Sequence, residues 1–304
     1  AGRSATSTYL PARRRRSVVR PLVVAAVALV LVTAGCGAGG GGDGGRTVNP
    51  ALASTPTASP TPTAEPEYPP GVSADAVDVT TLARSHDRAL RDVNSTVRFR
   101  RTVLAANGTV LSTRHSVVKR AGARLKGSYV RNGSVPGEDG PPIRAFAFWT
   151  NGSVTALRTV GDDGGVSYRA VPGRPPTVAS TDDSGQGELL DAFDGANPRI
   201  ADTVAVAGER LFVVVAERDR LERNGHRAEN FSATAYVTED GIVRGYEVRY
   251  TAVHGSENGS VTATVVESFG VTTGDTDAAP PAWVDTALAA SAESETDPAN
   301  ESTP

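Results

Sequence analysis

Hydrophobic and polar positions alternate along most of the chain between residues 96 and 269. β-Branched residues are frequent in these runs, and a period of two is typical of strands that bury one face. Asn-Gly and Asp-Gly pairs, such as Asn107-Gly108 and Asp240-Gly241, separate several runs and favour tight turns. The pattern predicts nine or ten strands, at 96–104, 109–120, 123–131, 143–150, 154–160, 166–171 (the shortest candidate), 211–216, 231–238, 242–251 and 260–269.

A helical spacing precedes the strands. Apolar residues recur at intervals of three and four from Val79 to Val93, which places them on one stripe of a helix. Asp78 stands where an N-cap is needed, because its carboxylate can accept a hydrogen bond from the first turn. A shorter helix is predicted at Glu188–Phe193, after a stretch rich in Pro, Gly and Asp.

Sequential strands joined by short turns favour an antiparallel meander, and a sheet of this size must curl or close. The predicted fold is α+β: a large curved antiparallel β-sheet, half-barrel-like and covered by one or a few helices, at residues 71–290. Strands 143–150 and 211–216 are apolar on both faces, so something apolar must meet the second face. Two explanations stay open, namely a second core layer (made by 172–205 or by the sheet folding on itself) and a cavity for a hydrophobic ligand.

The N-terminus has the plan of an export signal. Arg13-Arg14-Arg15-Arg16 is followed by the apolar run 22–32 and then by Val32-Thr33-Ala34-Gly35-Cys36. The run is too short to cross a hydrocarbon core of roughly 30 Å as a helix. We predict a lipoprotein signal peptide at 1–35 with Cys36 in a lipobox as the lipidated residue. The alternative is a membrane-spanning anchor with an incidental cysteine.

Arg15-Arg16 resembles a twin-arginine signal, which leaves the twin-arginine and general export routes both open. Residues 36–70 are rich in Gly, Thr and Pro and have no apolar face, so they predict a flexible tether. Sugars O-linked to its Ser and Thr residues, or an undecorated linker, both fit that composition. Residues 291–304 predict a disordered acidic tail, and Trp283 with Val284 is expected to dock on the sheet.

Composition excludes several classes of function. The chain has 31 basic and 34 acidic residues, and this near-neutral balance argues against binding to nucleic acid. Its single cysteine excludes an intramolecular disulfide and a multi-cysteine metal cage. The four histidines lack metal-ligand spacing, and there is no Gly-x-Ser-x-Gly motif. We therefore expect no catalytic residue, no metal and no cofactor, and His86 is interpreted as a hydrogen-bonded core residue.

Two features concern the surface. Six basic residues gather on the first two predicted strands, where they suit either lipid headgroups or a solvated face paired with acids: Arg98, Arg100, Arg101, Arg114, Lys119 and Arg120. Seven Asn-x-Ser/Thr sequons are candidate glycosylation sites in an exported protein, although turns favour Asn-Gly in any case. They are Asn94, Asn107, Asn132, Asn151, Asn230, Asn258 and Asn300.

The chain resembles the surface lipoproteins of halophilic archaea in six segments. They are the lipobox, the tether, the segment 68–72, the opening helix 82–90, the strand–Asp-Gly–strand run 234–248 and the closing segment 281–284. The domain of that family resembles the lipoprotein-carrier fold of bacterial envelopes, the Lol-type and mycobacterial lipid-carrier lipoproteins. The resemblance covers nearly the whole chain. It implies a curved sheet wrapped around helices, with a groove for a lipid or a lipid-modified polypeptide, and it supplies no catalytic residues.

These features together predict a non-enzymatic lipoprotein, anchored by lipid to the outer face of the cytoplasmic membrane at the cell surface. Its expected ligand is a lipid or other hydrophobic molecule in a sheet–helix groove, with walls formed by Val97, Phe99, Phe146, Phe148, Trp149, Phe212 and Tyr236. The alternative is a structural or interaction protein of the cell envelope, without a ligand cavity, that meets other envelope proteins. A cavity that persists in the folded domain distinguishes the two.

Overall fold

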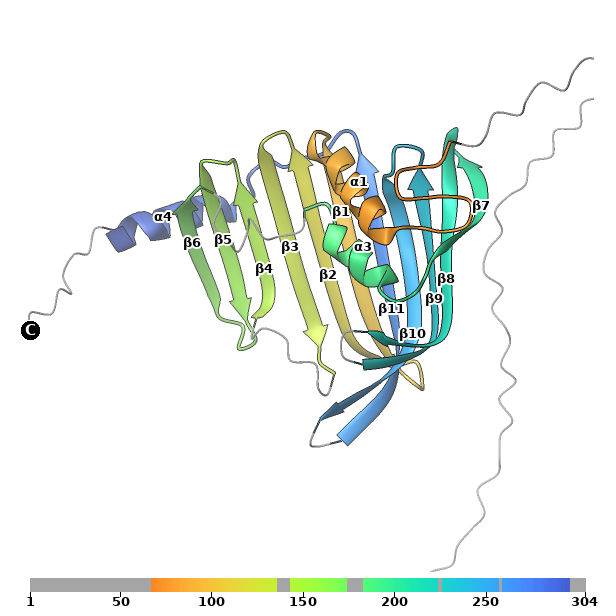
Figure 1. Cartoon of the computed structure of the whole chain (residues 1–304). Helices are drawn as coiled ribbons and strands as arrows, with labels where there is room; N and C mark the ends of the chain where they lie inside the picture. The colour runs from red at the N-terminus through yellow and green to blue at the C-terminus, as the bar shows by residue number, and fades with distance from the viewer. Residues whose placement is uncertain (1–66, 136–142, 174–182, 224–225, 257–258, 296–304) are drawn as a thin grey trace, which may run out of the picture. The chain divides into compact units, whose positions relative to one another are not determined.

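The computed structural model describes residues 67–135, 143–173, 183–223, 226–256 and 259–295 (Figure 1). All of these residues belong to one compact unit, Thr63–Pro304. The predicted signal peptide, Cys36 and most of the tether lie outside the described residues, as do Asn258 and Asn300.

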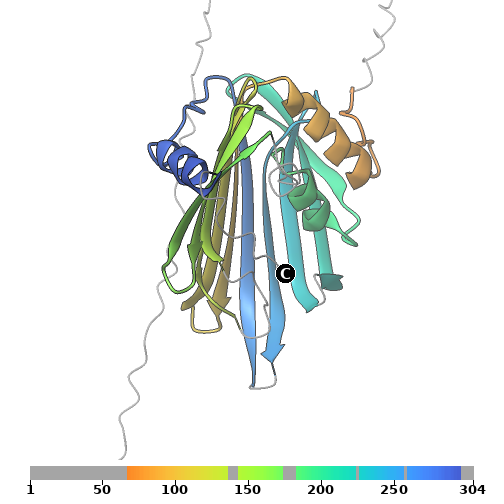
Figure 2. The same cartoon turned by 90° about the vertical axis from the view of Figure 1, so that its left-hand side faces the viewer.

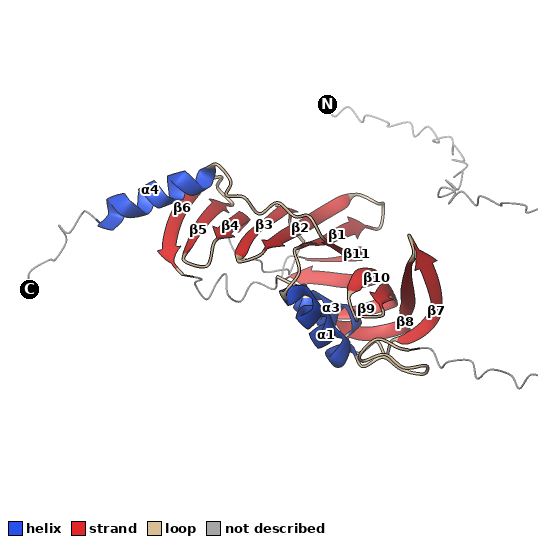
Figure 3. Ribbon diagram, turned by 90° about the horizontal axis from the view of Figure 1, so that it is seen from above, coloured by secondary structure: helices blue, strands red, loops and turns tan. Residues whose placement is uncertain are grey.

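The described strands form one antiparallel sheet of eleven strands. They are β1 (Ser95–Ala105), β2 (Val110–Ala121), β3 (Arg124–Gly133), β4 (Ile143–Thr150), β5 (Val154–Gly161), β6 (Val166–Pro172), β7 (Arg199–Val206), β8 (Glu209–Arg223), β9 (His226–Thr238), β10 (Val243–Ser256) and β11 (Gly259–Thr273). Two meanders, β1–β6 and β7–β11, join where β1 pairs with β11. This arrangement confirms the predicted large antiparallel sheet, and Figure 3 shows that it is curved.

Three helices of the described residues lie against the sheet: α1 (Val79–Arg91), α3 (Gln186–Phe193) and α4 (Trp283–Glu295). Helix α1 begins as predicted, because Asp78 accepts a hydrogen bond from the Thr81 amide at 3.1 Å. We call the face that carries α1 and α3 the concave face, and its opposite the outer face. Helix α4 lies on the outer face, beside β5 and β6 (Figures 2 and 3).

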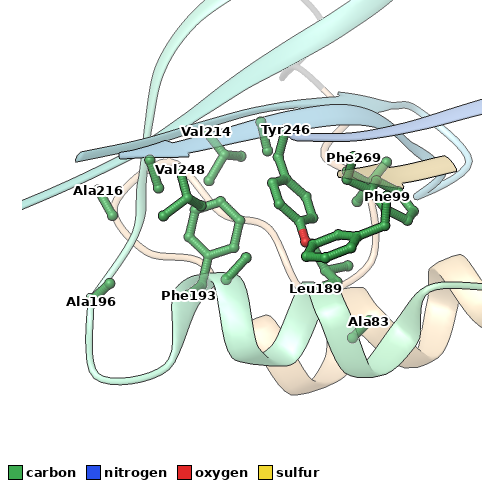
Figure 4. Packing of buried hydrophobic residues seen from close by; sticks show 14 of the residues in the cluster. Ala83, Phe99, Leu189, Phe193, Ala196, Val214, Ala216, Tyr246, Val248 and Phe269 are labelled. Atoms are coloured by element: carbon green, nitrogen blue, oxygen red, sulfur yellow. The ribbon is translucent and has the colours of Figure 1, made fainter. Parts of the chain in front are cut away.

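The main core lies between α1, α3 and the concave face of β8–β11 and β1. In Figure 4, Leu189 and Phe193 of α3 point toward sheet residues that include Tyr246 and Val248. The Tyr246 ring stacks on the Phe269 ring at a centroid distance of 5.1 Å. These side chains are buried, so this half of the sheet owes its stability to the apolar area that α1 and α3 remove from water.

The structure adds elements that the sequence pattern did not predict. Strand β7 was missed because its residues are mostly exposed and a bulge near Ile200 interrupts the alternation. Helix α4 was missed because small residues give it only a weak apolar stripe. Its end at Glu295 corrects the predicted disordered tail, since 291–295 is helical. The predicted docking of Val284 is confirmed, because this residue packs with Trp149 on the outer face.

His86 connects α1 to two other segments, as the interpretation of a bonded core histidine required. Its Nδ1 accepts a hydrogen bond from the Val243 amide at 3.0 Å, so the ring proton is on Nε2, which lies 2.9 Å from the Ser184 carbonyl oxygen. The side chain is fully buried.

We predict that His86→Leu lowers the free energy of unfolding by about 2 to 3 kcal/mol, because it removes both hydrogen bonds inside the core. Chemical denaturation followed by circular dichroism measures the loss. The matched control is His115→Leu, at an exposed position on β2. Equal losses in the two variants would show that the buried hydrogen bonds of His86 contribute nothing.

Candidate functional site

The predicted wall residues are distributed over three surfaces. Val97, Phe99 and Phe212 belong to the main core beneath α1 and α3. Phe146 and Phe148 lie on the same face of the sheet, but on β4 and in a separate cluster.

The last two predicted wall residues lie on the outer face. Trp149 is covered by α4, and its indole N–H donates a hydrogen bond to the Ala278 carbonyl oxygen at 3.0 Å. Tyr236 is 42% exposed. The structure therefore brings together Val97, Phe99 and Phe212, and separately Phe146 and Phe148. None of the grooves among the described residues contains all seven predicted wall residues.

The space between the helices and the sheet is filled. Leu189, Ala192 and Phe212 have no exposed surface, and Leu82 is almost as deeply buried. A hollow of about 440 Å³ lies beside the ends of α1 and α3, and no strand residue lines it. A smaller one, of about 240 Å³, lies near Asn94. Neither provides an apolar groove between helix and sheet.

The concave face continues beyond the helices onto β2–β6. It carries a second apolar cluster, in which Val118, Leu125 and Phe148 are buried and Phe146 and Leu157 are partly exposed. We call these five residues the helix-free patch, because none of the described helix residues belongs to the cluster. Cross-strand register places them on one face, since directly opposed antiparallel residues share a face.

A glycine shapes the floor of the helix-free patch. Gly127 on β3 is directly opposite Phe148 on β4, and a Cβ atom at Gly127 would fall 2.1 Å from the Phe148 ring. The ring therefore occupies the space that a side chain at position 127 would need, and it packs directly on the backbone of β3. The neighbouring Phe146 ring is 6.2 Å away between centroids.

Basic side chains surround this patch. Strands β1, β2 and β3 each carry three Arg or Lys residues, β4, β5 and β6 each carry one, and none of the six carries Asp or Glu. On the concave face, Arg101, Arg114 and Arg131 are direct cross-strand neighbours in a row. Like charges in such positions repel one another unless counter-charges offset them.

Each of these arginines has a different environment. Arg101 lies 3.4 Å from the buried carboxylate of Glu267, and Arg131 lies 3.1 Å from Asp162 in the β5–β6 turn. The Arg114 guanidinium lies over the Phe99 ring, 5.0 Å from its centroid, and its residue is exposed. Arg114 therefore stands at the boundary between the main core and the helix-free patch.

A buried ion pair links distant strands of the other half. Arg223 on β8 lies 2.6 Å from Glu267 on β11, with both side chains at most 5% exposed, and Arg223 also donates to the Asp191 carbonyl oxygen of α3. Burial lowers the pKa of Arg223, but the charge of Glu267 and the contact with Tyr250 raise it further, so the guanidinium stays charged. Burial and the same carboxylate raise the pKa of Tyr250 and Tyr246, so both phenols stay neutral, and the Tyr246 hydroxyl donates to the Glu188 carbonyl oxygen.

Candidate chemistry is sparse in the described residues. The His226 and His254 rings lie 5.0 Å apart, yet within the described ranges no group of three His, Cys, Asp or Glu residues is arranged to hold a metal ion. Burial raises the pKa of Asp191, which borders the larger hollow, although the charge of Arg223 opposes this shift. None of the described helices is long and apolar enough to cross a membrane.

The sequons in the described residues are all exposed: Asn94, Asn107, Asn132, Asn151 and Asn230. Three of these side chains already bond to turn backbone, since Asn107, Asn151 and Asn94 accept from neighbouring or facing amides. Asn230 has a positive φ of 53° on β9. Exposure is compatible with glycosylation, and the hydrogen bonds are compatible with a turn role alone.

Comparison with known proteins gives one family. A model described as a family of unknown function (DUF7537) matches residues 20–287. Among curated proteins, no sequence matches this chain.

Two solved structures are similar to the chain over 64% of its length. One is a DUF1329 family protein from Desulfovibrio piger, at 9% identity and a TM-score of 0.23, covered over 90% of its length. The other is described as an outer membrane lipoprotein-sorting protein domain from Vibrio parahaemolyticus, at 10% identity and a TM-score of 0.19, covered over 91%. TM-scores this low support no inference about function. The function proposed below is argued from the residues of this chain.

The buried ion pair gives a stability prediction. Glu267→Gln leaves the Arg223 charge buried without its counter-charge, so we expect the free energy of unfolding to fall by about 3 to 5 kcal/mol. The double variant Arg223→Met/Glu267→Leu removes both charges of this pair and should lose clearly less, although it also removes the Glu267 carboxylate from the more exposed Arg101. Urea denaturation measures both, and a double variant that is as unstable as the single one would contradict the dominance of the unpaired charge.

Proposed function

We propose that this chain, which belongs to the DUF7537 family of unknown function, is an exported, lipid-anchored protein that binds a hydrophobic ligand on the helix-free patch. The proposal has an anchoring part and a binding part. They rest on different regions of the chain and are tested separately.

The anchoring part rests on the N-terminal sequence. Small residues before Cys36 let a signal peptidase bind the extended backbone, and the cysteine thiol is the nucleophile that accepts lipid. A Gly- and Thr-rich coil between Cys36 and the first described residues would span roughly 30 Å on average. That reach lets the domain move over the outer face of the cytoplasmic membrane while it stays attached.

The binding part rests on one observation, the second apolar cluster on the concave face. Phe146 and Leu157 keep exposed surface there, while the cluster lies apart from the core that α1 and α3 cover. Aromatic and aliphatic side chains in contact with water attract apolar partners, because burying their surface is favourable. We therefore assign the site to the half of the concave face that no described helix covers, and we interpret the sheet–helix interface as packing.

The second candidate function is an interaction protein of the cell envelope. The filled space between α1, α3 and the sheet favours it, because a ligand groove at that place was the expected sign of a carrier. In this alternative the helix-free patch binds another envelope protein, and exposed sequons carry glycans that limit other contacts. Both candidates are non-enzymatic.

We predict that Cys36→Ser moves the protein out of the membrane fraction, because the variant has no thiol to carry lipid. Fractionation of host cells with detergent partitioning measures this, and metabolic labelling with an alkyne fatty acid reports the modification itself. Retention of the Cys36→Ser chain in the membrane fraction, without label, would favour the spanning-anchor alternative.

The ligand is tested by native mass spectrometry of the full chain purified from its own membranes, followed by organic extraction. We expect a co-purified hydrophobic molecule near one per chain. Phe146→Asp should reduce the bound fraction at least fivefold, because it places a charge on the patch, and Tyr236→Asp is the matched control on the outer face. A ligand-free mass, with no uptake of a fluorescent fatty-acyl probe, would favour the interaction protein.

A further inference from the structure

We propose that the ligand of the helix-free patch is an anionic amphiphile, whose carboxylate or phosphate headgroup is held by Arg114 and Arg131. This inference rests on the proposed function and deepens it. It names the chemical class of ligand that the concave face of β2–β5 fits.

The strand register places a charged region and then an apolar region one after the other along strands β2–β4. Arg114 and Arg131 are directly opposite each other on β2 and β3. Two residues further along β3, Tyr129 is opposite Phe146, and after two more Gly127 is opposite Phe148. Each step of two residues is about 7 Å, so the apolar floor begins one step from the guanidinium groups and extends away from them.

Leu157 on β5 extends this floor sideways. It is directly opposite Phe148 and partly exposed, so the apolar strip runs across β3, β4 and β5. A chain lying on it would contact Phe146 and Leu157, which keep exposed surface beside the buried Phe148, while its head remains at the arginines. The arrangement has one polar end and one apolar end, as an amphiphile does.

The charges favour an anion at the polar end. Within the described residues, Asp162 is the carboxylate in ion-pair distance of Arg131; the Asp162 side chain is 56% exposed and that of Arg131 is 22% exposed. Arg114 has no carboxylate in ion-pair distance among the described residues. Two guanidinium groups side by side repel, and a carboxylate or phosphate between them converts this repulsion into charge-assisted, bidentate hydrogen bonds.

The outer face of the neighbouring strand β1 carries two arginines without this combination. Arg98 and Arg100 are exposed there, opposite Val117 and His115 of β2. They provide charge of the same sign without an aromatic floor. Substitutions at Arg98 and Arg100 therefore distinguish binding at a specific headgroup site from attraction by the overall positive charge of strands β1–β6.

The test compares two fluorescent probes on the full chain with Cys36→Ser: 11-(dansylamino)undecanoic acid and its methyl ester, which differ only in the charge at one end. We expect the acid to bind at least tenfold more tightly than the ester. Arg114→Gln/Arg131→Gln should weaken binding of the acid at least tenfold and leave the ester unchanged, which also reports that the fold is intact. Arg98→Gln/Arg100→Gln is the matched control and should change neither.

Three outcomes would overturn the inference in distinguishable ways. Equal affinity for acid and ester would refute the anionic headgroup while the hydrophobic-ligand proposal stands. An equal effect of the outer-face control would attribute the preference to the general field. Absence of saturable binding by both probes would refute the proposed function as well. Competition by dodecyl phosphate and by dodecanoate then shows whether a phosphate or a carboxylate head is preferred.

Discussion

The ion pair between Arg223 and Glu267 constrains the whole β7–β11 half of the sheet. Strands β8 and β11 are separated by β9 and β10, so in a flat sheet they would lie about 14 Å apart. The two side chains nevertheless meet at 2.6 Å on the concave side. The sheet must therefore curl, and the ends of β8 and β9 must turn across it, as Figure 1 shows near its lower edge.

Asn230 makes that turn possible. Its φ of 53° is a left-handed conformation that Asn tolerates better than most residues, and it breaks the alternation of β9. Phe231 and Ala228 are consequently both buried, although strict alternation would place them on opposite faces. The curled half wraps around α1 and α3 and uses its concave face for packing. On the other half, Phe146 and Leu157 keep exposed surface and Arg114 is exposed, which is why the ligand is assigned there.

Local features of the fold were predictable from the sequence, because neighbouring residues determine them. The alternation, the turn at Asn107-Gly108 and the Asp78 cap identified the sheet and its first helix. The grouping of the wall residues was not predictable, because it depends on pairing across strands. Phe148 and Trp149 are adjacent in sequence and lie on opposite faces of the sheet.

The same reason explains what the sequence analysis missed at the site. The cluster of basic residues on the first two strands was visible, and it included Arg101 and Arg114. Arg131 completes the row only through the β2–β3 register, and Leu125 and Leu157 join the patch only through the pairing of β3, β4 and β5. Apolar residues on single strands give no signal of their own that separates a binding floor from a core.

The central claim is that a hydrophobic ligand binds the half of the concave face that no described helix covers, and not the sheet–helix interface. Photo-crosslinking of the full chain in its own membranes with a diazirine-bearing fatty acid, followed by peptide mass spectrometry, tests it most directly. The account predicts saturable crosslinks confined to β3–β5, chiefly on peptides that contain Phe146 and Leu157. Crosslinks concentrated on α1 and α3, or spread evenly over both faces of the sheet, would contradict it.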